Sequence, residues 1–214
     1  MKLLVTAGPT REFLDPVRFL SNRSTGKMGY AVAAAGVARG HEVVLVSGPV
    51  SLPPPVGVST LRVVSAADML EAVFASFDTC DALVMSAAVA DWRPKNRAVQ
   101  KLKKNTMSGT LELERTVDIL RALRERRRTE QTVIGFAAET ERVIESAREK
   151  CLAKGLDMVV ANDVSRLDAG FEVDTNVVCL VDSQGVEELP LMPKADVAER
   201  IVQWIERFRS VRGR

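Results

Sequence analysis

The sequence predicts an α/β protein whose mostly parallel sheet is covered by helices on both faces. Short apolar runs of strand length alternate with longer segments of helical periodicity, which is the order of β–α–β units. A late hairpin pattern, NVVCLVD–SQG–VEELPL, predicts one antiparallel strand near the C-terminal edge. No repeat or linker divides the 214 residues. They therefore predict a single domain, 1–214, with a buried core.

The expected elements follow in chain order. Seven apolar runs, bounded by turn residues, have the length of strands, namely 3–7, 42–47, 60–64, 82–87, 132–137, 158–161 and 176–181. Five segments have helical patterns, namely 28–39, 66–77, 117–127, 141–154 and 194–208. Pro193 stands where proline is favoured at the start of the last helix. The loop SGPVSLPPPVG is too rich in proline for either regular element.

Composition excludes several classes of protein. With 46% apolar residues, 27% charged residues and a net charge of +2, the chain gives no general reason to expect nucleic acid. Its longest apolar runs, such as 81–90, are too short for a membrane span. Met1 leads almost directly into a predicted strand, so we expect no signal peptide. The three cysteines form no CxxC pair, so we expect reduced thiols in a cytoplasmic protein.

Two long polar segments interrupt the alternation. Residues 8–26 follow the first predicted strand, and residues 91–109 follow the fourth and are basic. Loops of more than about 12–15 residues in a compact domain are usually functional or disordered. In open α/β sheets, ligands bind at the carboxyl ends of strands, where both segments begin. The site is therefore expected between them.

The stretch SNRSTGKMG at 21–29 joins a strand to a helix and invites comparison with phosphate loops. It fails the Walker A pattern, because Ser21 stands where a glycine is needed and Met28 follows the lysine. Ser24 or Thr25 can cap the helix, and amides around 26–29 could hold an anion. On these residues alone, a phosphate site and a plain capped helix both stay open.

Each of the other candidate residues has a purely structural interpretation as well as a functional one. The run KLKK at 101–104 is a solvated charge cluster or a mobile phosphate-binding flap within 91–109. Arg18 can be a surface arginine, and Asn22 can satisfy loop backbone. Asp91 follows a strand, where acidic residues meet a ribose hydroxyl or a cation, but it can also cap a turn. Phe136 can simply belong to the core.

The catalytic residue types that are missing restrict the chemistry. The sole histidine, His41, lies in a connection expected at the opposite end of the sheet, and no Ser/His/Asp set or metal-ligand spacing occurs. Nucleotidyl transfer to a carboxylate suits such a chain, because the nucleophile is already ionised at pH 7. The protein then aligns the reactants and offsets charge.

Six motifs occur in the order and spacing of bacterial phosphopantothenoylcysteine synthetase, and the chain resembles that family over essentially all 214 residues. The motifs are TAGPTREFLDPVRFLSNRSTGKMG, LVSGPVSLPPP, AAVADWRP, KLKK, GFAAET and ANDVS. The resemblance implies a three-layer fold with Rossmann-like and ribokinase-like features. It implies a ligase that joins 4′-phosphopantothenate to L-cysteine with CTP and Mg²⁺ through an acyl-cytidylate, releasing pyrophosphate and CMP.

The resemblance also implies roles for individual residues. Asn22 matches the asparagine that stabilises the acyl-cytidylate, Arg18 an arginine at the phosphopantothenate end, and Lys101 the flap lysine on the nucleotide. The alanine pair Ala87 and Ala88 matches residues that line the substrate side. The implied nucleotide contacts are Met85, Ser86, Ala87, Asp91, Lys101, Val117, Asp118, Ile119, Leu120, Phe136, Lys150 and Lys154. No metal ligand is assigned, since the triphosphate is expected to hold Mg²⁺.

The resemblance implies a homodimer, and family members are often fused to a flavin-dependent decarboxylase, which would be a second partner. An edge hairpin exposes unpaired backbone groups that a two-fold partner can cover. We therefore expect a dimer in which the partner closes the phosphopantothenate end, with Asn22 or Arg18 reaching across. The alternative is a nucleotide- or NAD-binding module without ligase activity, or an inactive scaffold paired with a decarboxylase.

Overall fold

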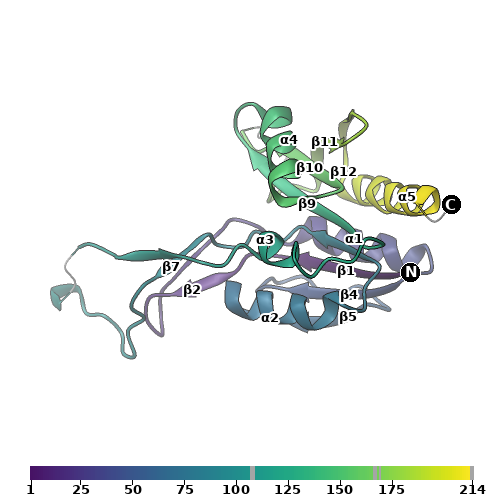
Figure 1. The fold of residues 1–214 in the computed structure, drawn as a ribbon. Coiled ribbons are helices and arrows are strands. Elements are labelled where there is room, and N and C mark those ends of the chain that lie inside the picture. The colour runs from purple at the N-terminus through teal and green to yellow at the C-terminus, as the bar shows by residue number, and fades with distance from the viewer. Residues whose placement is uncertain (107–108, 166–167, 169, 213–214) are drawn as a thin grey trace.

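A computed structural model describes residues 1–106, 109–165, 168 and 170–212. Its centre is an eight-stranded sheet in the order β12-β11-β10-β9-β6-β1-β4-β5 (Figure 1). The pairings from β10 through to β5 are all parallel, and β11 runs antiparallel to both of its neighbours. The predicted fold class, including one antiparallel strand near the C-terminal edge, is confirmed.

The elements of the main sheet and its helices have the following bounds. The strands are β1 (Lys2–Ala7), β4 (Glu42–Ser47), β5 (Ser59–Arg62), β6 (Ala82–Met85), β9 (Thr132–Glu139), β10 (Met158–Asp163), β11 (Thr175–Asp182) and β12 (Val186–Pro193). The helices are α1 (Lys27–Ala38), α2 (Ala66–Phe77), α3 (Ile119–Leu123), α4 (Val143–Lys154) and α5 (Lys194–Arg212).

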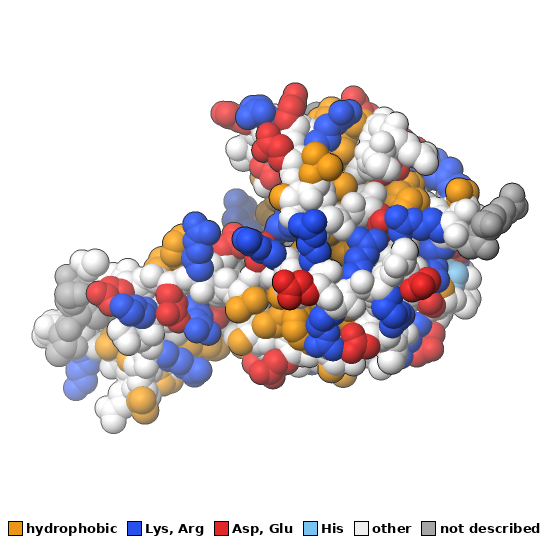
Figure 2. Space-filling model, viewed as in Figure 1, with side chains coloured by type: hydrophobic (Ala, Val, Ile, Leu, Met, Phe, Trp, Pro, Cys, Tyr) orange, Lys and Arg blue, Asp and Glu red, His pale blue; other side chains and the backbone are white. Residues whose placement is uncertain are grey.

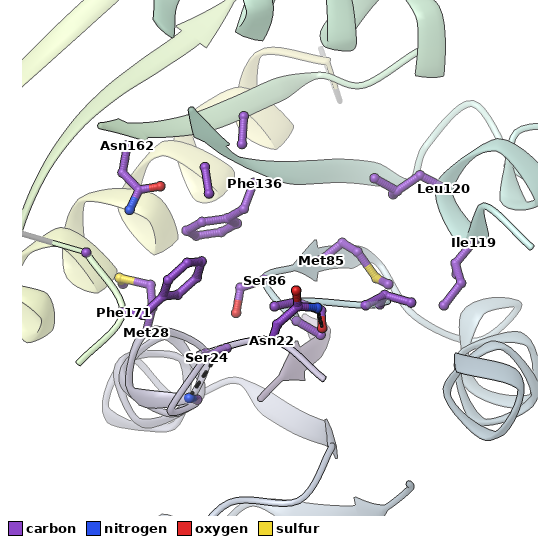
Figure 3. Close-up of a pocket in the computed structure, with 18 of the residues that line it drawn as sticks. Asn22, Ser24, Met28, Met85, Ser86, Ile119, Leu120, Phe136, Asn162 and Phe171 are labelled. Atoms are coloured by element: carbon purple, nitrogen blue, oxygen red, sulfur yellow. Dashed lines mark hydrogen bonds between the residues drawn. The ribbon is translucent and has the colours of Figure 1, made fainter. Parts of the chain in front are cut away.

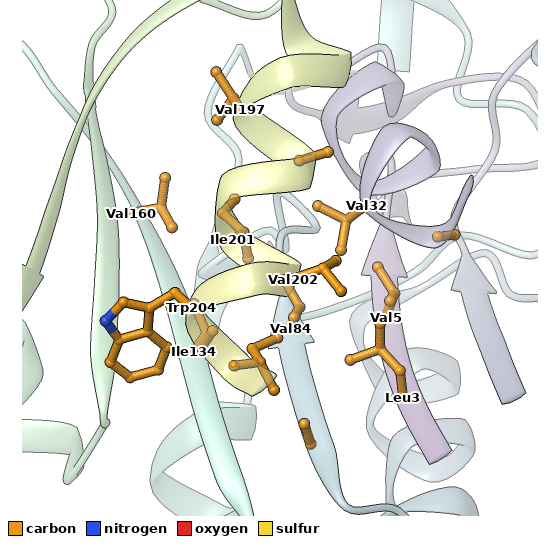
Figure 4. Close-up of a cluster of buried hydrophobic side chains, with 14 of the residues drawn as sticks. Leu3, Val5, Val32, Val84, Ile134, Val160, Val197, Ile201, Val202 and Trp204 are labelled. Carbon is orange, nitrogen blue, oxygen red and sulfur yellow. The ribbon is translucent and has the colours of Figure 1, made fainter. Parts of the chain in front are cut away.

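The helices form a layer on each face of the sheet, which gives three layers in all. Buried side chains of α1 and α5 pack on one face, where Val32, Ile201 and Val202 meet Val5 and Val84 (Figure 4). On the other face, buried side chains of α2, α3 and α4 pack with those of the same strands. Because successive residues of a strand point to opposite faces, each central strand contributes to both cores.

Local sequence signals fix several helix ends. Ser65 caps α2 in a capping box with Asp68, whose amide donates to the serine hydroxyl at 3.1 Å. Gly155 ends α4 in the left-handed conformation with φ 63°, which glycine adopts without strain. The helix α5 begins at Lys194, directly after Pro193 ends β12.

Two expectations about regular structure were wrong. The helix expected over 117–127 spans only Ile119–Leu123, because the Asp118 carboxylate accepts from the Arg121 amide at 3.1 Å and fixes a later start. The segments 8–26 and 91–109, expected to lack regular structure, contain short strands. They are β2 (Arg11–Phe13), β3 (Phe19–Ser21) and β7 (Trp92–Pro94), with a 3₁₀ turn at Lys104–Thr106, and the strand β8 (Leu113–Arg115) follows just beyond the second segment.

These short strands pair outside the main sheet, β2 with β3 and β7 with β8. Together with the described residues between β7 and β8 they form what we call the arm, residues 11–21, 92–106 and 109–115. Figure 1 shows it projecting from the body of the molecule. The two halves are joined where the Ala98 amide donates to the Leu14 carbonyl at 2.8 Å, and where the Arg97 guanidinium lies 5.2 Å from the Phe13 ring centroid.

Among the described residues, no helix combines the length and the apolar character that crossing a membrane would require.

Candidate active site

A cavity of 370 Å³ opens at the carboxyl edge of the sheet. It lies where β1 and β6 diverge, since the chain continues from β1 to β4 on one side and from β6 to β9 on the other. This is the topological switch point at which open α/β sheets bind ligands. Figure 3 shows the lining side chains converging from α1, from the ends of β6, β9 and β10, and from α3.

The N-terminus of α1 forms one wall of the cavity, and it has no side-chain cap. Its N-cap residue is Gly26, in the left-handed conformation with φ 81°. The expectation that Ser24 or Thr25 caps the helix was wrong. The Ser24 hydroxyl accepts from the Gly26 amide at 3.4 Å, and the Thr25 hydroxyl donates to the Phe171 carbonyl at 2.7 Å. The first-turn amides and the positive end of the helix dipole therefore stay available to an anion.

The turn that follows β6 forms the floor. Ser86 donates to the Thr6 carbonyl at 2.8 Å, and the Ala87 amide donates to the Thr6 hydroxyl at 3.1 Å, so both are held against the end of β1. Asn22 lies over this turn, and its carboxamide donates to the Ala88 carbonyl at 2.9 Å (Figure 3). The chain thus brings Asn22 and the alanine pair together, as the sequence predicted.

The opposite end of the cavity is lined by α3 and α4. Lys154 forms an ion pair of 2.9 Å with Asp118, and Lys150 donates to the Phe136 carbonyl at 2.5 Å. Burial lowers the pKa of Lys150, and the nearby charge of Lys154 lowers it further. Burial favours a higher pKa for Asp118, but the Lys154 ammonium and the Arg121 amide outweigh it, so the net shift is downward. These two lysines supply positive charge beside a partly neutralised carboxylate.

Most of the predicted site residues meet at this one cavity. Those that line it are Asn22, Met85, Ser86, Ala87, Ala88, Asp91, Val117, Asp118, Ile119, Leu120, Phe136, Lys150 and Lys154. Arg18 and Lys101 do not line it. They lie on the arm, where the Arg18 guanidinium donates to Asp15 at 2.7 Å and to the Leu102 carbonyl at 2.8 Å. The same arginine holds the pKa of the buried Asp15 carboxyl well below its usual range.

Sequence reasoning missed other lining residues. Asn162 is 8% exposed, lines the cavity, and its carboxamide has no hydrogen-bond partner among the described residues (Figure 3). It belongs to the ANDVS motif, whose sequence assigns no role to the asparagine. Four others come from segments far along the chain that no local pattern joins to the site. They are Gly170, Phe171, Asn176 and Lys194.

The charges around the cavity favour an anionic ligand. Lys27, Lys150, Lys154 and Lys194 line it, against Asp91 and Asp118. Figure 2 shows lysine and arginine side chains gathered across the waist of the visible face. Within the described part of the chain, no three His, Cys, Asp or Glu side chains gather as a metal site. The arrangement can bind and align anions, with Asn22 as a neutral donor at its centre.

Comparison with known proteins gives consistent matches. The family model described as DNA/pantothenate metabolism flavoprotein C-terminal domain matches residues 1–208. The coenzyme A biosynthesis bifunctional protein CoaBC of Bacillus subtilis (strain 168) is 52% identical over 205 residues, which cover 95% of this chain and 50% of that protein. The chain thus spans about half the length of the curated relatives it matches.

Two solved structures have a similar fold. The crystal structure of the C-terminal domain of coenzyme A biosynthesis bifunctional protein CoaBC is 47% identical, with a TM-score of 0.82, covering 97% of this chain and 94% of that one. A Cab2 mutant in complex with phosphopantothenate-cysteine is 18% identical, with a TM-score of 0.81, covering 98% and 86%. At that identity, the second match shows the fold alone.

Proposed function

This chain belongs to the DNA/pantothenate metabolism flavoprotein C-terminal domain family, and from that premise we propose that it is a ligase joining 4′-phosphopantothenate to L-cysteine. The pantothenate carboxylate attacks the α-phosphorus of CTP, which releases pyrophosphate and forms an acyl-cytidylate. The cysteine amine then attacks the acyl carbon, CMP leaves, and the amide of phosphopantothenoylcysteine remains. The full-length relative named for coenzyme A biosynthesis and the solved C-terminal domain of a protein of that name support this proposal.

The position of Asn22 is the observation that carries the proposal. Its carboxamide lies over the turn after β6, between the uncapped N-terminus of α1 and the end of the cavity that holds Lys150 and Lys154. A neutral amide donor at this point can stabilise negative charge that develops on the acyl oxygen. The first step needs no imidazole base, because its nucleophile is an ionised carboxylate.

The two ends of the cavity suggest how the nucleotide lies. The apolar side chains of α3, together with Lys150 and Lys154, suit the base and ribose. The triphosphate then extends toward the N-terminus of α1, where free amides favour phosphate. Asn162, buried and without a partner among the described residues, is placed to donate to a phosphate oxygen. Nothing in this arrangement selects CTP over ATP, and the choice of CTP rests on the resemblance.

Magnesium would enter as the chelate of the triphosphate. The described residues offer no cluster of three acidic ligands, and Asp118 is already paired with Lys154. Asp91 is the remaining carboxylate on the cavity wall. Since Mg²⁺ is usually held by one or two carboxylates plus substrate phosphates, this donor set fits a nucleotide-borne ion and does not fit a resident metal centre.

We further propose a homodimer formed through the arm. The arm carries exposed apolar side chains, including Trp92 at 46% and Val99 at 91% exposed, an unusual density for a surface without a partner. Arg18 and Lys101 lie on it, outside the cavity of their own chain. A second copy whose arm reaches this cavity would bring both residues to the reaction. β12 is the edge strand of the main sheet, and its role in dimerisation stays a prediction.

A phosphopantothenoylcysteine decarboxylase is the other partner we propose. The relatives that match are about twice the length of this chain and are named as bifunctional proteins.

Pyrophosphate release tests the ligase proposal directly. Purified protein is given phosphopantothenate and Mg²⁺ with CTP or with ATP, first without cysteine and then with it. We expect a limited burst of pyrophosphate with CTP, and sustained release and CMP once cysteine is added. A protein that releases no pyrophosphate under any of these conditions is not the ligase. Stabilisation by NAD(P) without turnover would instead support a dinucleotide-binding module, and a response to no ligand would support a scaffold.

A further inference from the structure

The first residue of α5, Lys194, carries a buried cation that the reaction described above does not use. Its side chain is 5% exposed, although it lines the cavity. Among the described residues its ammonium has no carboxylate in an ion pair or hydrogen bond. It donates instead to three backbone carbonyls, those of Gly170 at 2.7 Å, Phe171 at 3.2 Å and Val173. Burying a lysine charge without a carboxylate partner is costly in free energy. A role for the three hydrogen bonds to backbone would explain why this lysine is buried.

All three carbonyls belong to one short segment, residues 170–174, which we call the strap. The Lys194 amide also donates to the Asp174 carbonyl at 2.9 Å, so one residue holds the strap by four hydrogen bonds. The strap begins at Gly170 with φ 115°, a backbone conformation that glycine adopts and other residues rarely do. That glycine lets the first carbonyl turn toward the ammonium.

On its other side, the strap is attached to the N-terminal end of α1. Lys27 donates to the Glu172 carbonyl at 2.8 Å and forms an ion pair of 2.7 Å with Asp174. Arg23 binds the Glu172 carboxylate through two nitrogens, at 3.2 and 3.0 Å. The strap therefore lies between α5 and α1.

Peptide geometry gives this arrangement a consequence for the cavity. In a trans peptide the N–H points away from the adjacent C=O. Because the carbonyls of Gly170 and Phe171 point at Lys194, the amides of Phe171 and Glu172 point away from it. Neither amide has an acceptor among the described residues. Gly170 and Phe171 both line the cavity, and Figure 3 shows Phe171 beside Met28.

We propose that Lys194 is a positioning residue, which holds the strap against the N-terminus of α1 so that the cavity wall is shaped for a polyphosphate anion. The lysine acts through backbone and does not contact the reacting atoms. Its kinetic consequences rest on the proposed ligase function, but its structural consequences do not. Loss of the ammonium should leave the Gly170 and Val173 carbonyls without this donor, and the Phe171 carbonyl with only the Thr25 hydroxyl among the described residues. The strap should then loosen and support the α1 terminus less firmly.

The test compares wild type with Lys194→Met, which keeps the length of the side chain and removes its donors. Lys2→Met is the matched control, since Lys2 lies at the start of β1 outside the cavity. Among the described residues, its side chain pairs only with Glu42, at 3.5 Å. Calorimetry measures the affinity for inorganic tripolyphosphate, which is the probe. Amide hydrogen exchange is measured in parallel for residues 170–174 and 23–29. We expect at least fivefold weaker binding and faster exchange in both segments for Lys194→Met alone. Lys194→Arg keeps the charge and the donors, so its tripolyphosphate affinity and its exchange rates should lie between those of wild type and Lys194→Met.

Enzyme kinetics provide a readout that a general loss of folded protein would not mimic. If Lys194 positions the strap, Lys194→Met should raise KM for CTP about fivefold or more and lower kcat less than twofold. A loss of folded enzyme would lower kcat and leave KM unchanged. Unchanged tripolyphosphate affinity and unchanged exchange in the strap would overturn the proposal. A wild-type protein that releases no pyrophosphate would end the ligase proposal, while exchange and tripolyphosphate binding would still decide the role of Lys194.

A second variant keeps the proposal testable if Lys194→Met does not fold. Gly170→Ala strains the strap at its positive φ, while the new Cβ meets no atom within 4 Å. It should weaken tripolyphosphate binding and speed exchange in 170–174. Wild-type behaviour of a folded Gly170→Ala protein would contradict the proposal.

Discussion

The close approach of α1 to the sheet at Gly29 gives the sharpest test of the site's geometry. A Cβ added there would lie 2.6 Å from the Ala7 Cβ, 2.6 Å from the Ser86 hydroxyl and 2.8 Å from the Thr6 carbonyl oxygen. Restoring ordinary contact, which begins at 3.4 Å, requires the helix to move by about 0.8 Å. Two of the three obstacles cannot rotate away, because one is backbone and one is a Cβ. Overpacking of this kind costs about 1–3 kcal/mol, against a gain of about 1 kcal/mol from alanine's higher helix propensity.

Gly36 supplies the matched control on the same helix. A Cβ there meets only the ends of two side chains, Leu3 Cδ2 and Val43 Cγ2, both at 2.9 Å, and these can rotate. Gly36 does not line the cavity. We therefore expect Gly36→Ala to stay within about 1 kcal/mol of wild type, and Gly29→Ala to be about 1–3 kcal/mol less stable than Gly36→Ala.

Activity should separate the two variants more widely than stability does. Gly29 lies in the first turn of α1, so a shift of about 0.8 Å moves the anion-binding amides relative to Ser86 and Asn22. A misplacement of about 1 Å can cost on the order of 10²-fold in rate. Urea unfolding and pyrophosphate release measure the two effects. Wild-type turnover by Gly29→Ala, with stability equal to that of Gly36→Ala, would refute this account of the helix contact.

Four further predictions follow from the same geometry. Asn22→Asp should lower turnover on the order of 10²–10³-fold, because it replaces a donor with a negative charge, while CTP affinity measured by calorimetry stays near wild type. Lys101→Gln should slow pyrophosphate release from CTP. If Lys101 and Asn22 serve one site from different chains, mixing the Lys101→Gln and Asn22→Asp proteins should restore some activity. A strictly monomeric enzyme by light scattering would contradict this shared site. Asp15→Asn should loosen the arm, because Asp15 accepts from the backbone and guanidinium of Arg18 and from the Leu102 amide, and faster protease cleavage within 92–106 would report it. Burial lowers the pKa of Lys194 from 10.5 to about 8, so between these pH values the unfolded chain binds more protons than the folded chain. The free energy of unfolding of wild type should therefore rise with pH relative to that of Lys194→Met. The same change in urea midpoint between pH 7.5 and pH 10 for both proteins would contradict this prediction.

Most of the main sheet could be predicted because its signals are local. The runs 3–7, 42–47 and 132–137 are mostly apolar, as is typical of strands buried on both faces, and they lie within β1, β4 and β9. The boundaries of α2 match the expected 66–77, since its capping box is written in adjacent residues. The arm could not be predicted in the same way. Its strands have three residues each and pair outside the main sheet, so no periodicity can develop.

The residues of the candidate site also differ in whether a local sequence signal could identify them. Asn22, the turn after β6 and Phe136 lie in or beside motifs that start where strands end, and position at a strand end already suggests a ligand site. Lys194 and Asn176 reach the cavity only because α5 and β11 return to its edge, which is a property of topology. Thr25 illustrates a different limit. Its type and place suggested a helix cap, but a tertiary acceptor at Phe171 takes the hydroxyl.

The position of the cavity explains why one ligand can engage so much of the chain. Its walls come from α1, in the layer on one face of the sheet, and from α3 and α4, in the layer on the other. Only at the edge where β1 and β6 diverge can one molecule contact both layers. The two segments that leave this edge, after β1 and after β6, are those that build the arm. The same divergence that opens the cavity therefore sends out the arm, and Arg18 and Lys101 leave with it. In the dimer that we propose, these two cations return to the cavity from a second chain, so dimerisation and catalysis should be lost together when the arm is disrupted.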